Sequence, residues 1–242
     1  MPNDRPFVFV NAAITVDGKL DTVERRGARI SSQSDLERVG RLRAESDAVM
    51  VGGHTLLRED PRLTVKSPAL LAQRRERGLD ENPMKVAVVS KLEDPQIGSG
   101  IADDSKFLNA GPARRVIFTT EQTGPAQIAR LRALGVEVFV MGERKVDLAE
   151  ALRRLKELGV KRLMVEGGGT LIAELLQLRL VDEIHVYIAP LIFGGASAPT
   201  LADGAGLTAG EAIRLRVLSL EQSEEGGIIV RYAIMKNGDD RR

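Results

Sequence analysis

The sequence has no cysteine and no tryptophan, and its only histidines are His54 and His185. The absence of cysteine excludes disulfides and thiolate catalysis, and zinc sites are poorly supported because their usual ligands are cysteine and histidine. So few histidines also disfavour a Ser-His-Asp mechanism. Chemistry supplied by a bound cofactor therefore explains an enzyme of this composition better than a side-chain nucleophile does.

The sequence also lacks a concentrated charge of one sign and any long apolar run. Its formal net charge is +1, which argues against non-specific nucleic-acid binding, because such binding needs a strongly basic face. No run approaches the roughly 18 apolar residues of a transmembrane helix, and the start of the chain shows no signal-peptide pattern. We expect a cytoplasmic protein without nucleic-acid or membrane partners.

The stretch 160–195 holds the clearest pattern in the sequence. The apolar run 162–165 ends at Glu166, three glycines follow, and leucines then recur at helical spacing. A second apolar run, 184–189, ends before Pro190. This order predicts a strand, a helix and a second strand, with the parallel pairing and right-handed crossover of such a unit.

Gly167, Gly168 and Gly169 stand between the first of these strands and the helix. Glycines there would let the backbone approach a ligand closely and would present free N–H groups at the helix start, which favours an anion such as a diphosphate. A tight turn between strand and helix explains them equally well. Neither a Walker Lys-Ser/Thr pair nor a G-x-G-x-x-G motif is present in this stretch.

The rest of the chain alternates between strand-like and helix-like patterns. We therefore expect an α/β protein with about eight strands, mostly parallel, helices on both faces, and a C-terminal antiparallel hairpin formed by 213–220 and 228–235. The other predicted strands are 7–14, 47–53, 85–89, 115–119 and 136–140, and the other predicted helices are 34–45, 67–83, 125–134 and 148–158.

Two of these helices have a predicted orientation. The helix at 34–45 carries a one-sided stripe that we expect to face the core. The stripe consists of Leu36, Val39, Leu42 and Arg43. The helix at 67–83 is very basic, and we interpret Arg74 and its charged neighbours as a solvated face rather than a phosphate site.

Ligands of parallel α/β sheets bind at the carboxyl ends of the strands. We therefore expect functional residues directly after the predicted strands. These positions are 13–17, 52–55, Ser90, Thr119 and Thr120, 166–170 and 190–195.

Three segments at these strand ends resemble a known family. They are NAAITVDGK at 11–19, SDAVMVGGHTLLREDPRLTV at 46–65 and VEGGGTLIAELLQLRLVDEIHVYIAPLIFGG at 165–195. The chain resembles the pyrimidine reductases of riboflavin biosynthesis, which include free-standing archaeal-type enzymes and the C-terminal half of bacterial bifunctional deaminase/reductases. The resemblance covers nearly the whole chain in order. We expect no deaminase half, because the cysteines of its zinc site are missing.

This resemblance implies a dihydrofolate-reductase-like, three-layer α/β/α fold in which residues 1–242 form a single reductase domain. It also implies a homodimer and NADPH as the hydride donor. The implied substrate is the ribosylamino-pyrimidinone 5′-phosphate of the riboflavin pathway, whose ribosyl group is reduced to ribityl by hydride transfer to C1′.

The resemblance also assigns site residues. Those expected to contact NADPH are Ala13, Thr55, Glu59, Ser90, Gly168, Gly169, Thr170, Leu171, Ile172, Ala173 and Glu174. Those expected to face the substrate are Gly27, Arg29, Leu63, Lys66 and Glu166. The family often has Asp where this chain has Glu59 and Arg where it has Lys66, and a lysine cannot grip a phosphate with a two-pronged fork.

Two carboxylates, Glu166 and Asp17, are candidates to protonate the imine nitrogen or ease ring opening. For Glu166 we prefer the role of an acceptor for the pyrimidinone amino groups, and for Asp17 that of a turn residue. Ser90 with Lys91 fits either a contact with the 2′-phosphate of NADPH or a solvated turn. We predict no metal site.

Two other functions stay open from the sequence. One is a dihydrofolate-reductase-like enzyme that acts on another pterin or pyrimidine. The other is a non-catalytic module that binds a dinucleotide without oxidising it.

Overall fold

The computed structural model describes residues 4–93 and 100–235, and these contain nine strands. The chain divides into two compact units. The first unit comprises the residues up to Phe7 together with Arg38–Gly168, and the second comprises Val8–Glu37 together with the residues from Gly169 onward. That the whole chain forms one domain stays a prediction.

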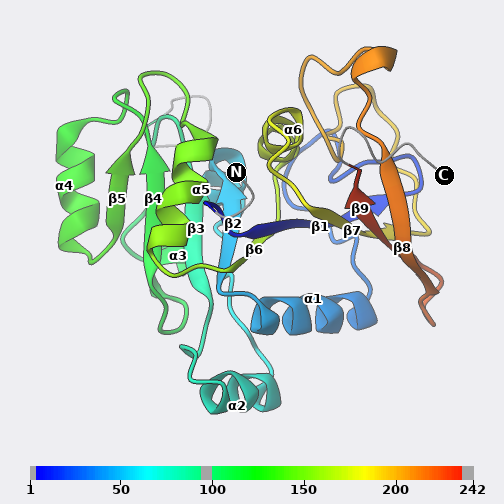
Figure 1. The fold of residues 1–242 in the computed structure, drawn as a ribbon, viewed down its shortest axis with the longest axis horizontal. Coiled ribbons are helices and arrows are strands. Elements are labelled where there is room, and N and C mark those ends of the chain that lie inside the picture. The colour runs from blue at the N-terminus through cyan, green and yellow to red at the C-terminus, as the bar shows by residue number, and fades with distance from the viewer. Residues whose placement is uncertain (1–3, 94–99, 236–242) are drawn as a thin grey trace. The chain divides into compact units, whose positions relative to one another are not determined.

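The first unit is built on a parallel sheet with the strand order β5-β4-β3-β2-β6 (Figure 1). Its strands are β2 (Ala48–Gly52), β3 (Met84–Val88), β4 (Arg115–Thr119), β5 (Glu137–Val140) and β6 (Arg162–Val165). Every residue of β2 is buried, as are most residues of β3, β4 and β6. Burial on both faces of the sheet explains why these strands read as continuous apolar runs rather than as alternating patterns.

Helices and short turns connect these strands. They are η1 (Thr55–Glu59), α2 (Pro68–Glu76), α3 (Lys106–Asn109), α4 (Pro125–Ala133) and α5 (Leu148–Glu157). In α5 the buried residues recur at helical spacing, from Leu148 to Leu155, and Asp147 accepts a hydrogen bond from the backbone N–H of Glu150 at 3.0 Å. One apolar stripe and one capping carboxylate thus account for this helix.

The second unit holds β1 (Phe7–Thr15, whose first residue belongs to the first unit), β7 (Glu183–Ala189), β8 (Leu215–Gln222) and β9 (Ile228–Ile234), with α6 (Gly169–Gln177) and η2 (Ala209–Glu211). The hairpin β8–β9 is antiparallel, as predicted. β7 pairs in parallel with β1 and antiparallel with β9, so the prediction that β6 and β7 pair with each other was wrong. The pattern of a strand-helix-strand unit defines its elements but not the strand that lies beside each of them.

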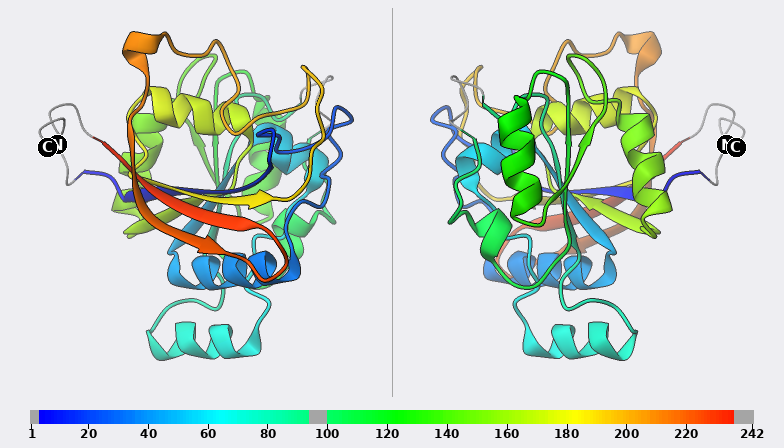
Figure 2. Two further views of the ribbon diagram at one scale, coloured as in Figure 1. Left: turned by 90° about the vertical axis from the view of Figure 1, so that its right-hand side faces the viewer. Right: turned by 90° about the vertical axis from the view of Figure 1, so that its left-hand side faces the viewer.

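Helix α1 (Gln33–Glu45) begins in the second unit and ends in the first. Its N-terminus lies beside the tip of the β8–β9 hairpin (Figure 2). There Glu225 accepts hydrogen bonds from the backbone N–H and the hydroxyl of Ser34 at 2.9 and 2.7 Å. These bonds lower the pKa of Glu225 to about 2. A carboxylate at this position also favours the helix dipole.

The predicted apolar stripe of α1 was wrong in detail. Leu36 is 43% exposed, and the buried residues of the helix include Asp35 and Ala44 instead. Arg43, which the spacing grouped with the leucines, forms polar contacts described below. A periodic pattern fixes which residues share a face, but the neighbours of that face depend on the tertiary fold.

Two fully buried cations stabilise the first unit. Lys85, on β3, donates hydrogen bonds to the carbonyl oxygens of Phe107 and Ala110 at 3.0 and 2.6 Å, at the end of α3. Burial lowers the pKa of Lys85 to about 8, and the charge of the nearby Arg115 adds to the shift. The carbonyl groups replace the water that the ammonium group loses on folding.

Arg74 corrects a second expectation, because it is 2% exposed and does not lie on a solvated face. Its guanidinium group donates hydrogen bonds to the carbonyl oxygens of Ala44 and Ser46 at 2.9 and 2.7 Å, and to that of Asp80 at 2.8 Å. Burial lowers the pKa of Arg74, as does the charge of Arg77. Helix α2 is shorter than the predicted helix, and one of its arginines caps the carbonyl groups that end α1.

None of the helices in the described part of the chain has the length and apolar character that crossing a bilayer requires.

We predict that Arg74→Met lowers the free energy of unfolding by about 3 kcal/mol, because it leaves several buried carbonyl groups without a donor. Urea unfolding followed by circular dichroism measures this change. Arg75→Met is the matched control, since Arg75 pairs with Glu81 while its side chain is 60% exposed. Removing a surface pair should change the free energy of unfolding by less than about 0.5 kcal/mol. Equal effects of the two substitutions would contradict the capping role of Arg74.

Candidate functional site

The carboxyl ends of four strands lie along one edge of the first-unit sheet, which we call the rim. The parallel register aligns Gly52 with Val88, Val88 with Phe118, and Met50 with Val165. The residues that follow these strands therefore share one edge, as the sequence predicted for this unit (Figure 1).

After β2, the chain turns into η1 with Thr55 at its start. A Cβ atom on Gly53 would lie 3.1 Å from Cγ1 of Val89, so glycine here allows the ends of β2 and β3 to approach closely. The backbone N–H of Gly52 donates to the carbonyl oxygen of Gly167 at 2.7 Å. Thr55 and Gly168 are brought together, because a Cβ atom on Gly168 would lie 3.4 Å from the Thr55 hydroxyl.

After β3, the residue Ser90 is half-buried and its backbone carbonyl accepts a hydrogen bond from the hydroxyl of Thr120 at 2.6 Å. Thr120 itself is fully buried. This contact joins the ends of β3 and β4 and leaves the hydroxyl of Ser90 for other partners. Lys91, the next residue, is also half-buried.

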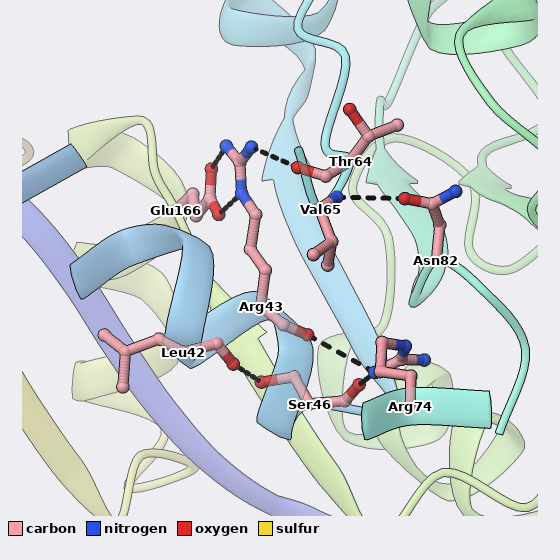
Figure 3. A network of polar contacts seen from close by, with 8 residues as sticks. All are labelled: Leu42, Arg43, Ser46, Thr64, Val65, Arg74, Asn82 and Glu166. Carbon is pink, nitrogen blue, oxygen red and sulfur yellow. Dashed lines mark hydrogen bonds and ion pairs between the residues drawn. The ribbon is translucent and has the colours of Figure 1, made fainter. Parts of the chain in front are cut away.

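After β6, the side chain of Glu166 forms a two-pronged ion pair with Arg43 from the last turn of α1 (Figure 3). Nε and Nη2 of Arg43 donate to the two carboxylate oxygens, each at 2.6 Å. The side chains are 17% exposed for Arg43 and 13% for Glu166. Burial opposes the charge of Arg43, but the Glu166 carboxylate outweighs it and raises the pKa of Arg43 above its ordinary value.

The third nitrogen of this guanidinium group contacts the segment between η1 and α2. Nη1 of Arg43 donates to the carbonyl oxygen of Thr64 at 3.1 Å, and the side-chain oxygen of Asn82 accepts from the backbone N–H of Val65 at 2.9 Å (Figure 3). Asp60 accepts from the backbone N–H groups of Lys106 and Phe107 at 2.8 and 3.0 Å. Three side chains thus hold a segment without regular structure.

The segment at 60–67 carries two residues that the family resemblance assigned to the substrate. Leu63 is fully buried and has a φ of 51°, a left-handed conformation that a leucine rarely adopts. Lys66 is exposed, as is Glu59 at the end of η1. Leu63 therefore anchors the segment, whereas the side chain of Lys66 faces solvent.

In the second unit, the start of α6 is packed against the chain itself. A Cβ atom on Gly169 would collide with the carbonyl oxygen of Thr200 and would lie 3.0 Å from the carboxylate of Asp203. Leu171, Ile172 and Ala173 are buried, Glu174 is half-buried, and Thr170 is exposed. The buried side chains cannot meet a ligand directly, so contacts at these positions would be made by the backbone.

The other predicted residues of the second unit lie in two loops and on β1. Asp17 accepts hydrogen bonds from the hydroxyl of Thr15 at 2.6 Å and from the backbone N–H groups of Phe193 and Gly194 at 3.3 and 2.7 Å. The bond from Thr15 contributes most to lowering the pKa of Asp17. These contacts support the turn role that the sequence favoured for Asp17.

Gly27 has a φ of 78°, and its backbone N–H donates to the buried carboxylate of Asp21 at 2.7 Å. Arg29 follows on the same loop and is exposed, while Ala13 packs beside Tyr187. Asp21 therefore shapes the loop that carries two of the residues assigned to the substrate.

Comparisons with known proteins agree with this architecture. Residues 6–229 match the model of the RibD C-terminal domain family. The chain is 44% identical over 200 residues to the 2,5-diamino-6-ribosylamino-4(3H)-pyrimidinone 5′-phosphate reductase of Archaeoglobus fulgidus, covering 83% of this chain and 87% of the relative. It is 42% identical over 233 residues to the protein of the same name from Methanothermobacter thermautotrophicus, covering 95% and 99%. The chain belongs to the RibD C-terminal domain family.

A solved structure shows that the fold is also shared. The crystal structure of a pyrimidine reductase-like protein from Corynebacterium diphtheriae superposes with a TM-score of 0.78 at 21% identity, covering 96% of this chain and 93% of that one. The predicted α/β fold, mostly parallel with an antiparallel C-terminal pair, is confirmed for this RibD C-terminal domain protein.

Sequence reasoning missed several residues that build the site. Arg43 was grouped with an apolar stripe, and Asp21, Asp60 and Asn82 were not singled out. One signal was available for Arg43, because a permanently charged side chain within an apolar stripe requires a buried partner. The other three accept from backbone N–H groups, Asp21 within its own loop and Asp60 and Asn82 from other segments of the chain, and no spacing rule identifies such contacts.

We predict that Gly169→Ala lowers the free energy of unfolding by about 1–3 kcal/mol, because the added methyl group overpacks the contact with Thr200. Thermal unfolding would register the loss. Gly168→Ala is the matched control, since its Cβ would make only an ordinary contact at 3.4 Å with the Thr55 hydroxyl. A Gly169→Ala protein as stable as the wild type would refute the packing reason for this glycine.

Proposed function

We propose that this RibD C-terminal domain protein is the NADPH-dependent reductase that converts 2,5-diamino-6-ribosylamino-4(3H)-pyrimidinone 5′-phosphate to its ribitylamino derivative. The observation that carries the proposal is the 44% and 42% identity with two relatives that bear this reductase's name. Both alignments span most of each protein, so the similarity is not confined to one motif.

The rim of the first unit has the chemistry that a dinucleotide requires. Hydroxyl and glycine residues follow the strands there, with Thr55 beside Gly168, and Ser90 after the end of β3. Small residues allow close approach of phosphate groups to the backbone, and hydroxyls can donate to phosphate oxygens. The proposed NADPH contacts are those that the family resemblance assigned: Ala13, Thr55, Glu59, Ser90 and residues 168–174.

The reaction requires few groups from the protein. NADPH, when bound, would supply a hydride to C1′ of the imine that forms when the ribosylamine ring opens, and the imine nitrogen would take up a proton. The chain's own contribution is to hold the pyrimidinone and the sugar phosphate so that C1′ is correctly oriented and shielded from water.

Glu166 serves this reaction as a fixed acceptor rather than as a proton donor. Both of its oxygens are engaged by Arg43, an arrangement that requires the ionised carboxylate. An ionised carboxylate accepts hydrogen bonds only, which suits the amino group and ring N–H of the pyrimidinone. Asp17 stays the alternative proton donor, although its three hydrogen bonds favour a role in shaping the loop.

The phosphate group of the substrate calls for cations. Lys66 and Arg29 are both exposed, and the family resemblance assigned each of them to the substrate. Each is therefore a candidate phosphate contact within its own unit. Lys66 would act as a point charge, whereas the guanidinium group of Arg29 offers a two-pronged contact.

A homodimer explains the exposed apolar strand of the second unit. In the described residues β8 pairs only with β9, and none of its residues is fully buried. Val217 and Leu220 are 55% and 67% exposed. A long apolar edge strand promotes association unless a partner covers it. We propose that a second copy of the chain covers β8.

We predict that Leu220→Lys shifts the protein from dimer to monomer, because it places a charge in an apolar contact. Size-exclusion chromatography with light scattering would show a wild-type mass of twice 26.3 kDa and a variant mass close to 26.3 kDa. Leu178→Lys is the control, since Leu178 directly follows α6, is 55% exposed and lies outside β8. A monomeric wild type, or a dimer that survives Leu220→Lys, would exclude this interface.

We predict that the purified protein oxidises NADPH when the ribosylamino-pyrimidinone phosphate is added and not when dihydrofolate is added. Absorbance of the reduced nicotinamide follows the reaction, and mass spectrometry of the product should show a gain of two hydrogens. Turnover of dihydrofolate alone would favour a reductase of another pterin. Binding of NADPH without oxidation in the presence of either compound would favour a non-catalytic module.

A further inference from the structure

We infer that Arg43 is a positioning residue for the substrate, one that fixes the Glu166 carboxylate and the segment carrying Leu63 and Lys66 in a single geometry. This inference rests on the proposed function. Arg43 was not among the residues that the family resemblance assigned to the site. Its role follows from contacts within the first unit alone.

The first step of the inference is the geometry of the ion pair. A guanidinium group presents its donors in a rigid plane, so two parallel bonds to a carboxylate fix both the distance and the orientation of that carboxylate. Here both bonds measure 2.6 Å and both side chains are mostly buried. Glu166 therefore has one orientation at the rim rather than the several that an exposed glutamate samples.

The second step concerns the hydrogen-bond acceptor sites of Glu166 that Arg43 does not use. A carboxylate has about four lone-pair sites, and Arg43 uses one on each oxygen. One site on each oxygen is left for a ligand. These two sites point to opposite sides of the carboxylate, so a ligand N–H group can donate to one oxygen at a time. An amino or ring N–H group of a pyrimidinone can donate to such a site, whereas a carbonyl or phosphate oxygen, which only accepts, cannot.

The third step is the link to the segment at 60–67. The bond from Nη1 of Arg43 to the Thr64 carbonyl places that segment and Glu166 on one guanidinium group (Figure 3). Leu63 precedes Thr64 and Lys66 follows two residues later. The same side chain thus sets the distance between the proposed pyrimidinone contact and the proposed phosphate contact.

The fourth step is that Arg43 is itself held in place. Arg74 donates to the carbonyl oxygen of Ala44. Figure 3 shows that Arg74 also donates to the carbonyl oxygen of Ser46, and that the Ser46 hydroxyl donates to the carbonyl oxygen of Leu42, at 2.8 Å. The last turn of α1 is therefore rigid on both sides of Arg43. An arginine on a frayed helix end would not fix a partner to the accuracy that orientation of a substrate requires.

The test is a steady-state comparison of Arg43→Met, Arg43→Lys and the control Arg41→Met. Arg41 lies on the exposed face of the same helix. We expect Arg43→Met to raise KM for the pyrimidinone phosphate at least about tenfold, with kcat lowered less and the Kd of NADPH changed by less than about twofold. Arg43→Lys should recover only part of the loss, because an ammonium group cannot hold both oxygens.

A double-substitution cycle with Glu166→Gln separates positioning from direct contact. If Arg43 acts through Glu166, the double variant should have a KM close to that of Glu166→Gln alone. Losses that multiply would mean that Arg43 does not act through Glu166, and would overturn the inference. Thermal unfolding of each variant shows whether it is folded, and the double variant contains no unpaired buried charge, so the cycle stays informative if Arg43→Met is unstable.

The outcomes also separate this inference from the function on which it rests. An inactive wild type and an inactive Arg41→Met would overturn the proposed function, and this inference with it. An active wild type with an unchanged KM in Arg43→Met would overturn the positioning role alone and leave the reductase intact.

Discussion

Parallel hydrogen bonding between buried strands is the constraint on which the candidate site depends. Once β3, β2 and β6 are paired in register, the residues after them must emerge along one edge, however far apart they lie in the sequence. The backbone bond from Gly52 to Gly167 continues this register beyond the strands. Threonine, serine, glycine and glutamate residues then line the same rim, because each directly follows the carboxyl end of a strand whose position in the sheet is fixed.

Burial of positive charge is the second organising feature of the first unit, and it separates structural from functional residues. Lys85 and Arg74 donate to backbone carbonyls, so their hydrogen-bonding capacity is used to hold α3 and α1. Arg43 differs because its main partner is a carboxylate at the rim, which keeps unused acceptor sites. In all three cases hydrogen bonds offset the cost of removing a cation from water. Only the pair of Arg43 and Glu166 keeps acceptor sites that a ligand could use.

Much of the fold could be predicted from the sequence, because the element type follows from local periodicity. The limits of β4 and β6 were predicted to the residue, and those of α5 to within one residue at its end. What failed depended on contacts between distant segments. Tertiary packing determines which strand lies beside β7, why Arg74 is buried and which residue Arg43 pairs with. Local sequence patterns contain no information about such packing. The family resemblance supplied site residues, and it did not supply the side chains that position them.

The three glycines between β6 and α6 show why the sequence motif alone could not decide between a ligand-binding site and a tight turn. Gly167 adopts a φ of 112°, which a side chain would strain. Gly169 has no room for a side chain, because the chain's own Thr200 and Asp203 lie against it. Only Gly168 combines ordinary space with a neighbouring hydroxyl, from Thr55. Two of the glycines are therefore required by the fold, and the evidence for a ligand rests on the third. A loss of activity on replacing Gly167 or Gly169 would therefore be explained by disturbed folding, without a contact to the cofactor.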